Sequence, residues 1–268
     1  MRTENVTRQQ TNEHARLPDR SYPPTSEQMS NASVGFMESS YEQMRRAAKG
    51  LIFGRTFPAG SDSRELALTF DDGPNDPHTE RLLELLALYR VRAVFFLIGT
   101  FVRRRPDIAR AIHQGGHVLG NHTMTHPSLL WQKPSRVREE LAACNSAIED
   151  AVGVAVKWFR PPFGASRPDV MWTAAELGLT PVLWNVWGHD WDAERPEPIA
   201  ALVHEGVRVN QRYQRASNIL LHDGGHERMG VDRSATVAAT ESLLDAWTGS
   251  GVRLVTLDAW CSQRGPAF

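Results

Sequence analysis

A regular alternation of short apolar runs with longer helical stretches constrains this chain more than any other feature. The apolar runs have the length of strands and lie at residues 66–70, 93–98, 118–119, 157–159, 181–186, 219–221 and 254–257. The stretches with helical spacing lie at residues 78–89, 106–113, 134–151, 167–177, 198–207 and 234–247. Strands that alternate with helices of about 10–15 residues are typical of βα units around a parallel sheet. Because about 200 residues take part, the pattern predicts an α/β barrel of about seven strands rather than a small open sheet.

The first 60 residues do not share this alternation. Residues 1 to about 35 are rich in polar side chains and proline, and such a composition buries too little apolar surface to offset the entropy of ordering. Residues 36–49 carry apolar side chains near helical spacing, which predicts one short amphipathic helix. We therefore expect residues 1–60 to form a partly disordered N-terminal extension and residues 61–268 to form one main domain.

Charge and hydropathy exclude several classes of protein. Thirty basic and 31 acidic residues give a formal net charge of −1, which argues against a broad nucleic-acid-binding surface and against a polybasic membrane surface. The longest apolar stretch, residues 93–102, falls well short of the roughly 20 residues of a membrane span. Residues 1–20 contain no apolar segment of a secretion signal. The sequence as it stands predicts a cytoplasmic protein, or a secreted or envelope-associated one if its start is mis-assigned.

Cysteine usage adds little. The chain has only Cys144 and Cys261, so a scaffold of several disulfides is excluded. Two unpaired thiols are the expectation for a reducing compartment, and a single bridge is the alternative.

Charged, imidazole or aromatic side chains follow five of the expected strands. Barrel enzymes carry their chemistry at the C-terminal ends of the strands, so these positions are candidate site residues. They are Asp71, Asp72, His122, His126, Arg160, Asp190, Trp191 and His222. Each group alone has a structural alternative: Asp-Asp-Gly-Pro favours a turn, two histidines can lie at the surface, and a buried histidine can be a core residue.

Three of these residues form a candidate metal site. His122 and His126 are four residues apart, so on one helical turn they would face the same side. Together with Asp72 they offer two imidazole nitrogens and one carboxylate and leave positions open, as catalytic zinc sites do. The donor set therefore predicts one divalent metal ion, Zn²⁺ first, with Co²⁺ or Ni²⁺ suited to the same ligands.

Five segments, taken in order, closely resemble the motifs of the polysaccharide deacetylases, also called carbohydrate esterase family 4 or the NodB-like domain. They are Thr69-Phe70-Asp71-Asp72-Gly73-Pro74, His122-Thr-Met-Thr-His126, Arg160-Pro-Pro-Phe-Gly164, Asp190-Trp191 and Leu220-Leu221-His222-Asp223. The resemblance extends from about residue 64 to residue 257. It implies a distorted (β/α) barrel that removes N-acetyl or O-acetyl groups from sugars with a bound metal ion, and it makes residues 61–268 the catalytic domain.

The resemblance also implies roles for the residues at the first three strand ends. Asp71 would be the general base, and Asp72, His122 and His126 would be the metal ligands. Arg160 would hold Asp71 in position. This division agrees with the chemistry of amide hydrolysis, which needs an activated water and a group that accepts its proton.

The remaining motif residues would complete the reaction. By the same resemblance, the backbone N–H of Phe163 would join the metal in stabilising the oxyanion, and His222 would be the general acid, tuned by Asp190. Trp191 and Leu220 would form the walls of the pocket for the acetyl methyl group. Phe163 stands where the family often has Tyr, which removes a hydroxyl and leaves the backbone donor.

Several aromatic and histidine residues lie near the motifs without a defined role. Trp187 stands where the family often has an Asp, and we expect it, like Trp191, to line the cleft. Trp172 and Trp184 are expected in the core, whereas the position of Trp131 is left open. His226 is interpreted as a loop residue, with contact to the metal or the substrate as the alternative.

Three functions fit the motifs. The leading hypothesis is the removal of N-acetyl groups from N-acetylglucosamine-containing glycans or oligosaccharides, such as chitin oligosaccharides or peptidoglycan. The same machinery would serve an O-acetyl esterase on acetylated xylan, or another amide hydrolase such as a deformylase. A glycan-binding protein without activity is the third, and the complete set of motif residues argues against it. For the first two functions, the expected partner is an acetylated carbohydrate substrate.

Overall fold

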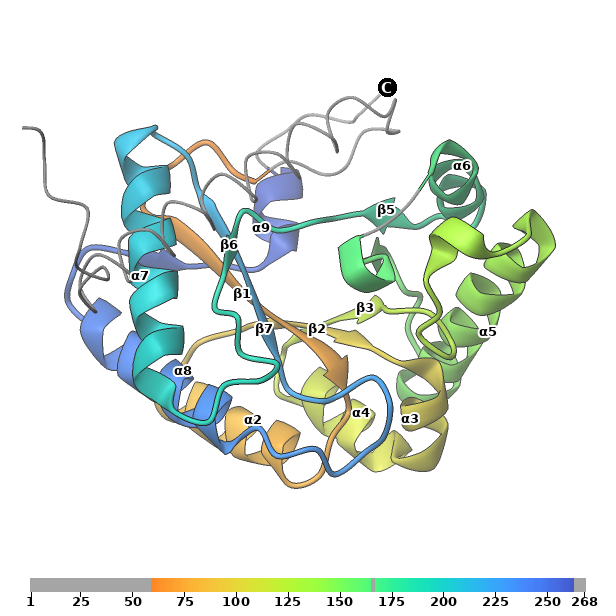
Figure 1. The fold of residues 1–268 in the computed structure, drawn as a ribbon, viewed down its shortest axis with the longest axis horizontal. Coiled ribbons are helices and arrows are strands. Elements are labelled where there is room, and N and C mark those ends of the chain that lie inside the picture. The colour runs from red at the N-terminus through yellow and green to blue at the C-terminus, as the bar shows by residue number, and fades with distance from the viewer. Residues whose placement is uncertain (1–58, 165–166, 263–268) are drawn as a thin grey trace, which may run out of the picture. The chain divides into compact units, whose positions relative to one another are not determined.

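The computed structural model describes residues 59–164 and 167–262. The helix expected at residues 36–49, and nearly all of the expected N-terminal extension, lie outside the described residues. A parallel sheet forms the centre of the fold, and Figure 1 shows helices on the outer side of its strands. The elements of its first half are β1 (Glu65–Gly73), α2 (His78–Leu88), β2 (Val94–Leu97), α3 (Gly99–Arg104), α4 (Pro106–Gln114), β3 (Val118–Asn121), a 3₁₀ turn (Leu129–Trp131) and α5 (Pro134–Val152).

The second half repeats the alternation of strand and helix. Its elements are β4 (Trp158–Phe159), a 3₁₀ turn (Pro162–Gly164), α6 (Pro168–Glu176), β5 (Thr180–Pro181), β6 (Val186–Trp187), α7 (Pro196–Arg212), β7 (Ser217–His222), α8 (Ser234–Trp247), β8 (Arg253–Leu254) and α9 (Leu257–Ser262). No helix in the described part of the chain is both long enough and apolar enough to cross a membrane.

Within the described residues all of the strand pairs are parallel, and seven strands follow the order β5-β4-β3-β2-β1-β7-β6. The eighth, β8, pairs with β1 beside this path. The sheet curls into a half-barrel, which confirms the prediction of a distorted (β/α) barrel with about seven parallel strands. Parallel strands bring their C-terminal ends to one edge, so the residues after β1, β3, β4, β6 and β7 become neighbours.

The expected run at residues 181–186 is not one strand. It contains part of β5 and the first residue of β6, which lie at opposite ends of the sheet order. The run at residues 254–257 is also shorter than expected, because α9 begins at Leu257. Two helices of six residues each, α3 and α9, were not predicted.

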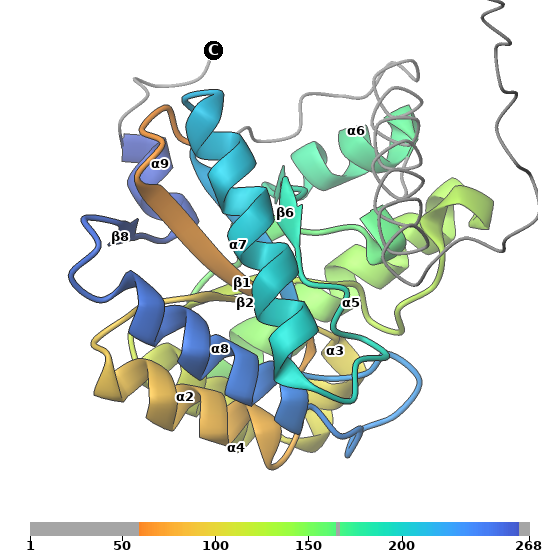
Figure 2. The same cartoon turned by 60° about the vertical axis from the view of Figure 1, so that its left-hand side comes forward.

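Alternate residues of the central strands face two separate hydrophobic clusters. Leu66, Leu68 and Phe70 of β1 belong to the larger cluster, together with apolar residues of the helices, whereas Ala67 belongs to a smaller cluster with Trp158. Successive strand residues point to opposite faces, so the larger cluster lies under the helices and the smaller one on the other face of the sheet. Contacts of α7 with α8, α8 with α2, α2 with α4, and α4 with α5 make a continuous helical layer. Figure 2 shows α8, α2 and α4 side by side beneath β1.

Two predictions outside the motifs can be compared with the structure. Trp172 was expected in the core, but its side chain is 65% exposed, because α6 buries Val170, Met171 and Ala174 and presents Trp172 outward. Cys144 is buried and Cys261 is half-buried, and both are free thiols.

Candidate functional site

The two adjacent carboxylates at the end of β1 lie where this strand becomes irregular. Asp71 still pairs in register with Phe96 of β2 and His222 of β7. The register with β2 shifts between Asp71 and Gly73, and Asp72 has a φ of 73°. Asp is among the residues that adopt this left-handed conformation most readily. The irregularity allows both carboxylates to lie at the same edge of the sheet, and both are buried.

Asp72, His122 and His126 come together as a group that could hold a metal ion. The Nε2 atoms of His122 and His126 lie 3.4 and 3.3 Å from Oδ1 of Asp72. One donor atom from each of the three residues lies within 4.8 Å of the others, and all three residues are buried. Among the described residues, Oδ1 of Asp72 has no hydrogen-bond partner. A buried carboxylate oxygen without a partner, between two imidazole nitrogens, fits a divalent cation.

The two histidines are not on a helical turn, as their spacing predicted. Residues 122–126 form an irregular segment after β3, in which Thr123 and His126 have φ values of 69° and 57°. The Asn121 side chain accepts a hydrogen bond from the Thr123 N–H (2.8 Å), and the Thr123 hydroxyl accepts one from the His126 N–H (3.0 Å). These side-chain bonds replace a helical turn and still bring both imidazoles to Asp72.

The charge states of Asp72 and His126 suit metal binding. Burial by itself raises the pKa of Asp72, but the neighbouring imidazoles of His122, His222 and His126 lower it below its ordinary value. Burial lowers the pKa of His126 to about 3. Burial also acts to lower the pKa of His122, but Asp71 and Asp72 raise it above its ordinary value. At neutral pH the cluster therefore offers an ionised carboxylate and at least one neutral imidazole.

Arg160, which directly follows β4, keeps the Asp71 carboxylate in position. Its Nη1 donates hydrogen bonds to Oδ1 of Asp71 (2.8 Å) and to the Thr69 hydroxyl (2.7 Å). The guanidinium carbon lies 4.1 Å from the centre of the Phe96 ring, and the Arg160 side chain is completely buried. The Arg160 carbonyl also lies 2.7 Å from Nδ1 of His122. One residue therefore orients both Asp71 and a histidine of the candidate metal site.

A second buried pair lies at the end of β7. Nδ1 of His222 is 2.8 Å from Oδ1 of Asp190, whose Oδ2 accepts hydrogen bonds from the His222 N–H (2.7 Å) and the Thr236 hydroxyl (2.8 Å). Burial acts to lower the pKa of His222, but the Asp190 carboxylate raises it to about 9. The pKa of Asp190 is lowered in turn, because His222 outweighs the effect of burial. At neutral pH His222 is therefore a cation that can donate a proton.

Aromatic residues lie beside His222 and beside the Asp72 cluster. Phe163 is 59% exposed with a φ of 60°, and Trp191 is exposed with its ring edge-on to His222 at 6.0 Å between centres. Trp187 is half-buried beside Trp191, with ring centres 5.7 Å apart. Leu220, in register with Trp187, is almost fully buried. Of the four residues expected at the substrate, Phe163, Trp187 and Trp191 are therefore at least partly exposed, and Leu220 is buried beside Trp187.

Sequence reasoning gave no role to two histidines that the structure brings into this region. The His189 ring lies against the rings of Trp187 (4.1 Å) and Trp191 (4.7 Å). The His226 ring stacks on His126 with centres 4.7 Å apart, and its Nδ1 lies 4.0 Å from Oδ2 of Asp72. Metal or substrate contact was only the alternative interpretation for His226. The signal was its position four residues after His222, in the loop that follows a motif strand.

Two further tryptophans are at least partly exposed. Trp184, expected in the core, is only half-buried, with ring centres 6.2 Å from Trp187. Trp131, whose position was left open, is 84% exposed.

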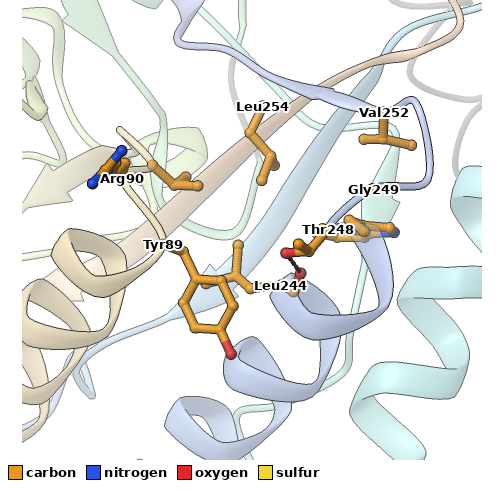
Figure 3. A pocket seen from close by; sticks show the side chains of 9 residues that line it. Tyr89, Arg90, Leu244, Thr248, Gly249, Val252 and Leu254 are labelled. Carbon is orange, nitrogen blue, oxygen red and sulfur yellow. Dashed lines mark hydrogen bonds between the residues drawn. The ribbon is translucent and has the colours of Figure 1, made fainter.

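A hollow lies apart from this group of residues. It is lined by Tyr89, Arg90, Val91, Leu244, Trp247, Thr248, Gly249, Val252 and Leu254. Figure 3 shows it beside the C-terminal end of α8 and the segment that leads to β8. None of the strand-end residues described above lines it.

Comparisons with known proteins agree with the fold and the motif residues. The polysaccharide deacetylase family model matches residues 59–182. A chitooligosaccharide deacetylase of Bradyrhizobium sp. strain ANU 289 is 36% identical over 207 residues, which cover 75% of this chain and 92% of that protein. A peptidoglycan-N-acetylglucosamine deacetylase of Bacillus cereus is 33% identical over 202 residues, with coverages of 75% and 90%.

A solved structure extends the similarity to three dimensions. It is the crystal structure of a peptidoglycan N-acetylglucosamine deacetylase in complex with 4-naphthalen-1-yl-N-oxidanyl-benzamide. It superposes with a TM-score of 0.67 at 30% identity and covers 76% of this chain and 91% of that one. With such relatives matched over nearly their whole length, the chain belongs to the polysaccharide deacetylase family and is a deacetylase hydrolase of the metal-dependent type.

Proposed function

We propose that this protein removes N-acetyl groups from N-acetylglucosamine-containing glycans or oligosaccharides. The observation that carries the proposal is the Asp72-His122-His126 cluster at the same sheet edge as two buried pairs, Asp71–Arg160 and His222–Asp190. The curated relatives named above support the substrate class, since both are named for substrates built from amino sugars.

The proposed metal ligands are Asp72, His122 and His126, and the proposed ion is Zn²⁺. Two imidazole nitrogens and one carboxylate are a ligand set of catalytic zinc sites, although Co²⁺ and Ni²⁺ suit the same donors. When bound, a divalent ion polarises the acetyl carbonyl and lowers the pKa of a water molecule.

Asp71 is the proposed general base. Its carboxylate would take one proton from the attacking water while the hydroxyl oxygen bonds to the carbonyl carbon of the acetamide. Arg160 keeps this carboxylate in position through the 2.8 Å bond to Oδ1. His122 Nε2 lies 3.7 Å from the other oxygen, Oδ2, which puts the base beside the proposed ligands.

His222 is the proposed general acid. It would donate its proton to the sugar nitrogen as the C–N bond breaks, which releases acetate and a free amine. Asp190 keeps His222 protonated at neutral pH through the raised pKa of about 9. The backbone N–H of Phe163 would stabilise the oxyanion, and Trp187, Trp191 and Leu220 would contact the substrate, with Trp191 and Leu220 around the acetyl methyl group.

Acetate release tests the proposal. The zinc-loaded and the metal-stripped protein would be incubated with N-acetylated chitin oligomers, peptidoglycan fragments and O-acetylated xylan. We expect metal-dependent release from an amino-sugar substrate. Release from xylan alone would reassign the enzyme to ester hydrolysis, and no release from any substrate with zinc present would overturn the proposed function.

The Asp71→Asn variant tests the base. We expect kcat to fall by about 10²–10⁴-fold, the usual contribution of acid–base catalysis, while zinc binding is retained. Asp150→Asn, which changes an exposed residue of α5 in the same way, is the matched control. An Asp71→Asn variant as fast as the parent would show that the base is wrongly assigned.

A further inference from the structure

The two histidines of the Asp72 cluster are held in different ways. Nδ1 of His122 lies 2.7 Å from the Arg160 carbonyl, the kind of second hydrogen bond that normally orients a metal-binding imidazole. Nδ1 of His126 is buried and, within the described ranges, has no hydrogen-bond partner. The direction of the His126 ring therefore has to be fixed by something other than a hydrogen bond.

Ring contacts surround His126 instead. The His226 ring stacks on it with centres 4.7 Å apart and an angle of 25° between the planes. The Phe163 ring meets it edge-on at 4.8 Å and 72°, and Phe163 and His226 are 5.6 Å apart. These separations are typical of aromatic pairs that favour a defined geometry. Two rings from different loops therefore enclose His126.

The loop that carries His226 is itself anchored close to the cluster. A Cβ atom on Gly224 would lie 2.1 Å from the Asp72 carbonyl oxygen, so the two backbones are in close contact. The Gly224 carbonyl accepts a hydrogen bond from the Arg233 side chain (2.7 Å), and the Gly230 N–H donates one to the Asn75 side chain (2.6 Å). These contacts fix the loop before and after His226, so the loop can hold the His226 ring in one position.

We propose that His226 is a positioning residue for the metal site and that it orients His126 by ring stacking. The inference rests on the proposed function only in taking Asp72, His122 and His126 as the metal ligands. The ring, and not a nitrogen atom, is the acting part, because Nδ1 of His226 lies 4.0 Å from Oδ2 of Asp72, which is beyond hydrogen-bond distance. The His226 side chain is 44% exposed, so its replacement leaves the core intact.

Three substitutions of His226 separate the effect of its aromatic ring from the effect of its nitrogen atoms. His226→Ala removes both, His226→Asn keeps a polar group near the position of Nδ1, and His226→Phe keeps an aromatic ring without nitrogen. The zinc dissociation constant would be measured by competition with a chromophoric chelator, and circular dichroism would verify folding. His204→Ala on α7 is the matched control, because it removes a half-buried histidine that meets the Trp247 ring edge-on.

We expect His226→Ala and His226→Asn to weaken zinc binding by about 10–100-fold, the range for the loss of a residue that supports a metal ligand. The zinc dissociation constants of His226→Phe and His204→Ala should stay within about threefold of that of the parent. Zinc binding by His226→Phe as weak as that of His226→Ala would overturn the inference and make His226 a nitrogen donor. Unchanged binding by His226→Ala would overturn it as well.

A second readout distinguishes this inference from the proposed function. In the cobalt-loaded protein, the visible absorption spectrum reports the number and type of donors. We expect the parent and His226→Phe to give the same spectrum, and a changed spectrum would count against positioning by the ring. If the parent binds neither zinc nor cobalt, the metal site of the proposed function fails and the inference falls with it.

Discussion

At the scale of single residues, the site contains two pairs of buried opposite charges. Arg160 is fully buried against Asp71, and Asp190 is fully buried against His222. Removing one partner of such a pair leaves an uncompensated charge, which costs far more than the pair contributes. Each proposed acid–base residue therefore has a buried partner that holds it in position, and Asp190 also keeps His222 charged.

The His222–Asp190 pair gives a titration prediction. Without a bound metal, His222 should titrate with a pKa of about 9. In Asp190→Asn the largest raising contribution is lost while burial remains, so the pKa of His222 should fall well below that of the parent, with Asp72 and Asp71 still raising it. Nuclear magnetic resonance of the imidazole nitrogens, assigned with His222→Gln, measures both values. A parent pKa near 6.5 would contradict the assigned role of Asp190.

The same pair links stability to pH. Because the folded pKa is the higher one, the pair stabilises the protein fully below about pH 6.5 and less as the pH rises through 9. The free energy of unfolding in urea should therefore decrease between these pH values in the metal-free parent. The decrease should be much smaller in Asp190→Asn, where the largest raising contribution is lost.

Residue types were easier to predict than their local conformations. The polar residues that follow apolar runs identified Asp72, His122 and His126, because strand ends meet at one edge of a parallel sheet. The helical turn expected for the histidines was wrong, since side-chain hydrogen bonds of Asn121 and Thr123 shape that segment. His226 lies in the loop after β7, so no helical or strand period predicts where its side chain points. Its contact with the cluster depends on how that loop folds back.

At the scale of elements, long periodic segments were predictable and short ones were not. The helices α2, α4, α5, α6, α7 and α8 were all expected within a few residues of their bounds. The six-residue helices α3 and α9 are too short to show a period. Residues 181–186 form one apolar run, and only the pairing partners reveal that β5 and β6 belong to opposite ends of the sheet.

The contact between the end of β1 and the loop after β7 gives a second prediction. A methyl group on Gly224 would clash with the Asp72 carbonyl and with Gly73, so one backbone has to move. Gly224→Ala should lower the free energy of unfolding by about 1–3 kcal/mol and also weaken zinc binding, because Asp72 shifts. Urea denaturation and chelator competition measure the two effects.

Gly249→Ala is the matched control. Gly249 has a φ of +73° and no neighbour within 4 Å of an added Cβ. Strain alone should destabilise this variant by about 1–2 kcal/mol without affecting zinc binding. If Gly224→Ala binds zinc as well as Gly249→Ala does, the two backbones are not coupled to the site.

At the scale of the whole molecule, the alternation of strands and helices predicted the barrel and its approximate extent. The expected domain at residues 61–268 remains a proposal, and it agrees with the compact unit Leu51–Phe268. All residues of the candidate site and both hydrophobic clusters belong to that unit. What the sequence could not predict is the order of strands, because order depends on pairings between distant segments.

A truncated chain tests this boundary. A chain of residues 51–268 should fold by itself, melt at the temperature of the full chain and bind zinc with the same affinity. A chain that begins at residue 68 should fail to fold, since it lacks the first three residues of β1, the strand that pairs with β2, β7 and β8. Calorimetry and zinc titration distinguish the outcomes, and an aggregated 51–268 chain would show that earlier residues are required.

The link between β5 and β6 has a consequence for protein engineering. These end strands follow one another in the chain, with only residues 182–185 between them. The Val182 carbonyl lies 3.5 Å from the Arg160 guanidinium, and the Leu183 carbonyl accepts a hydrogen bond from Asn218 at 2.6 Å. Lengthening this link would disturb both contacts and so loosen the arginine behind Asp71. The length of a surface-edge connection and the position of the proposed base are therefore not independent design variables in this scaffold.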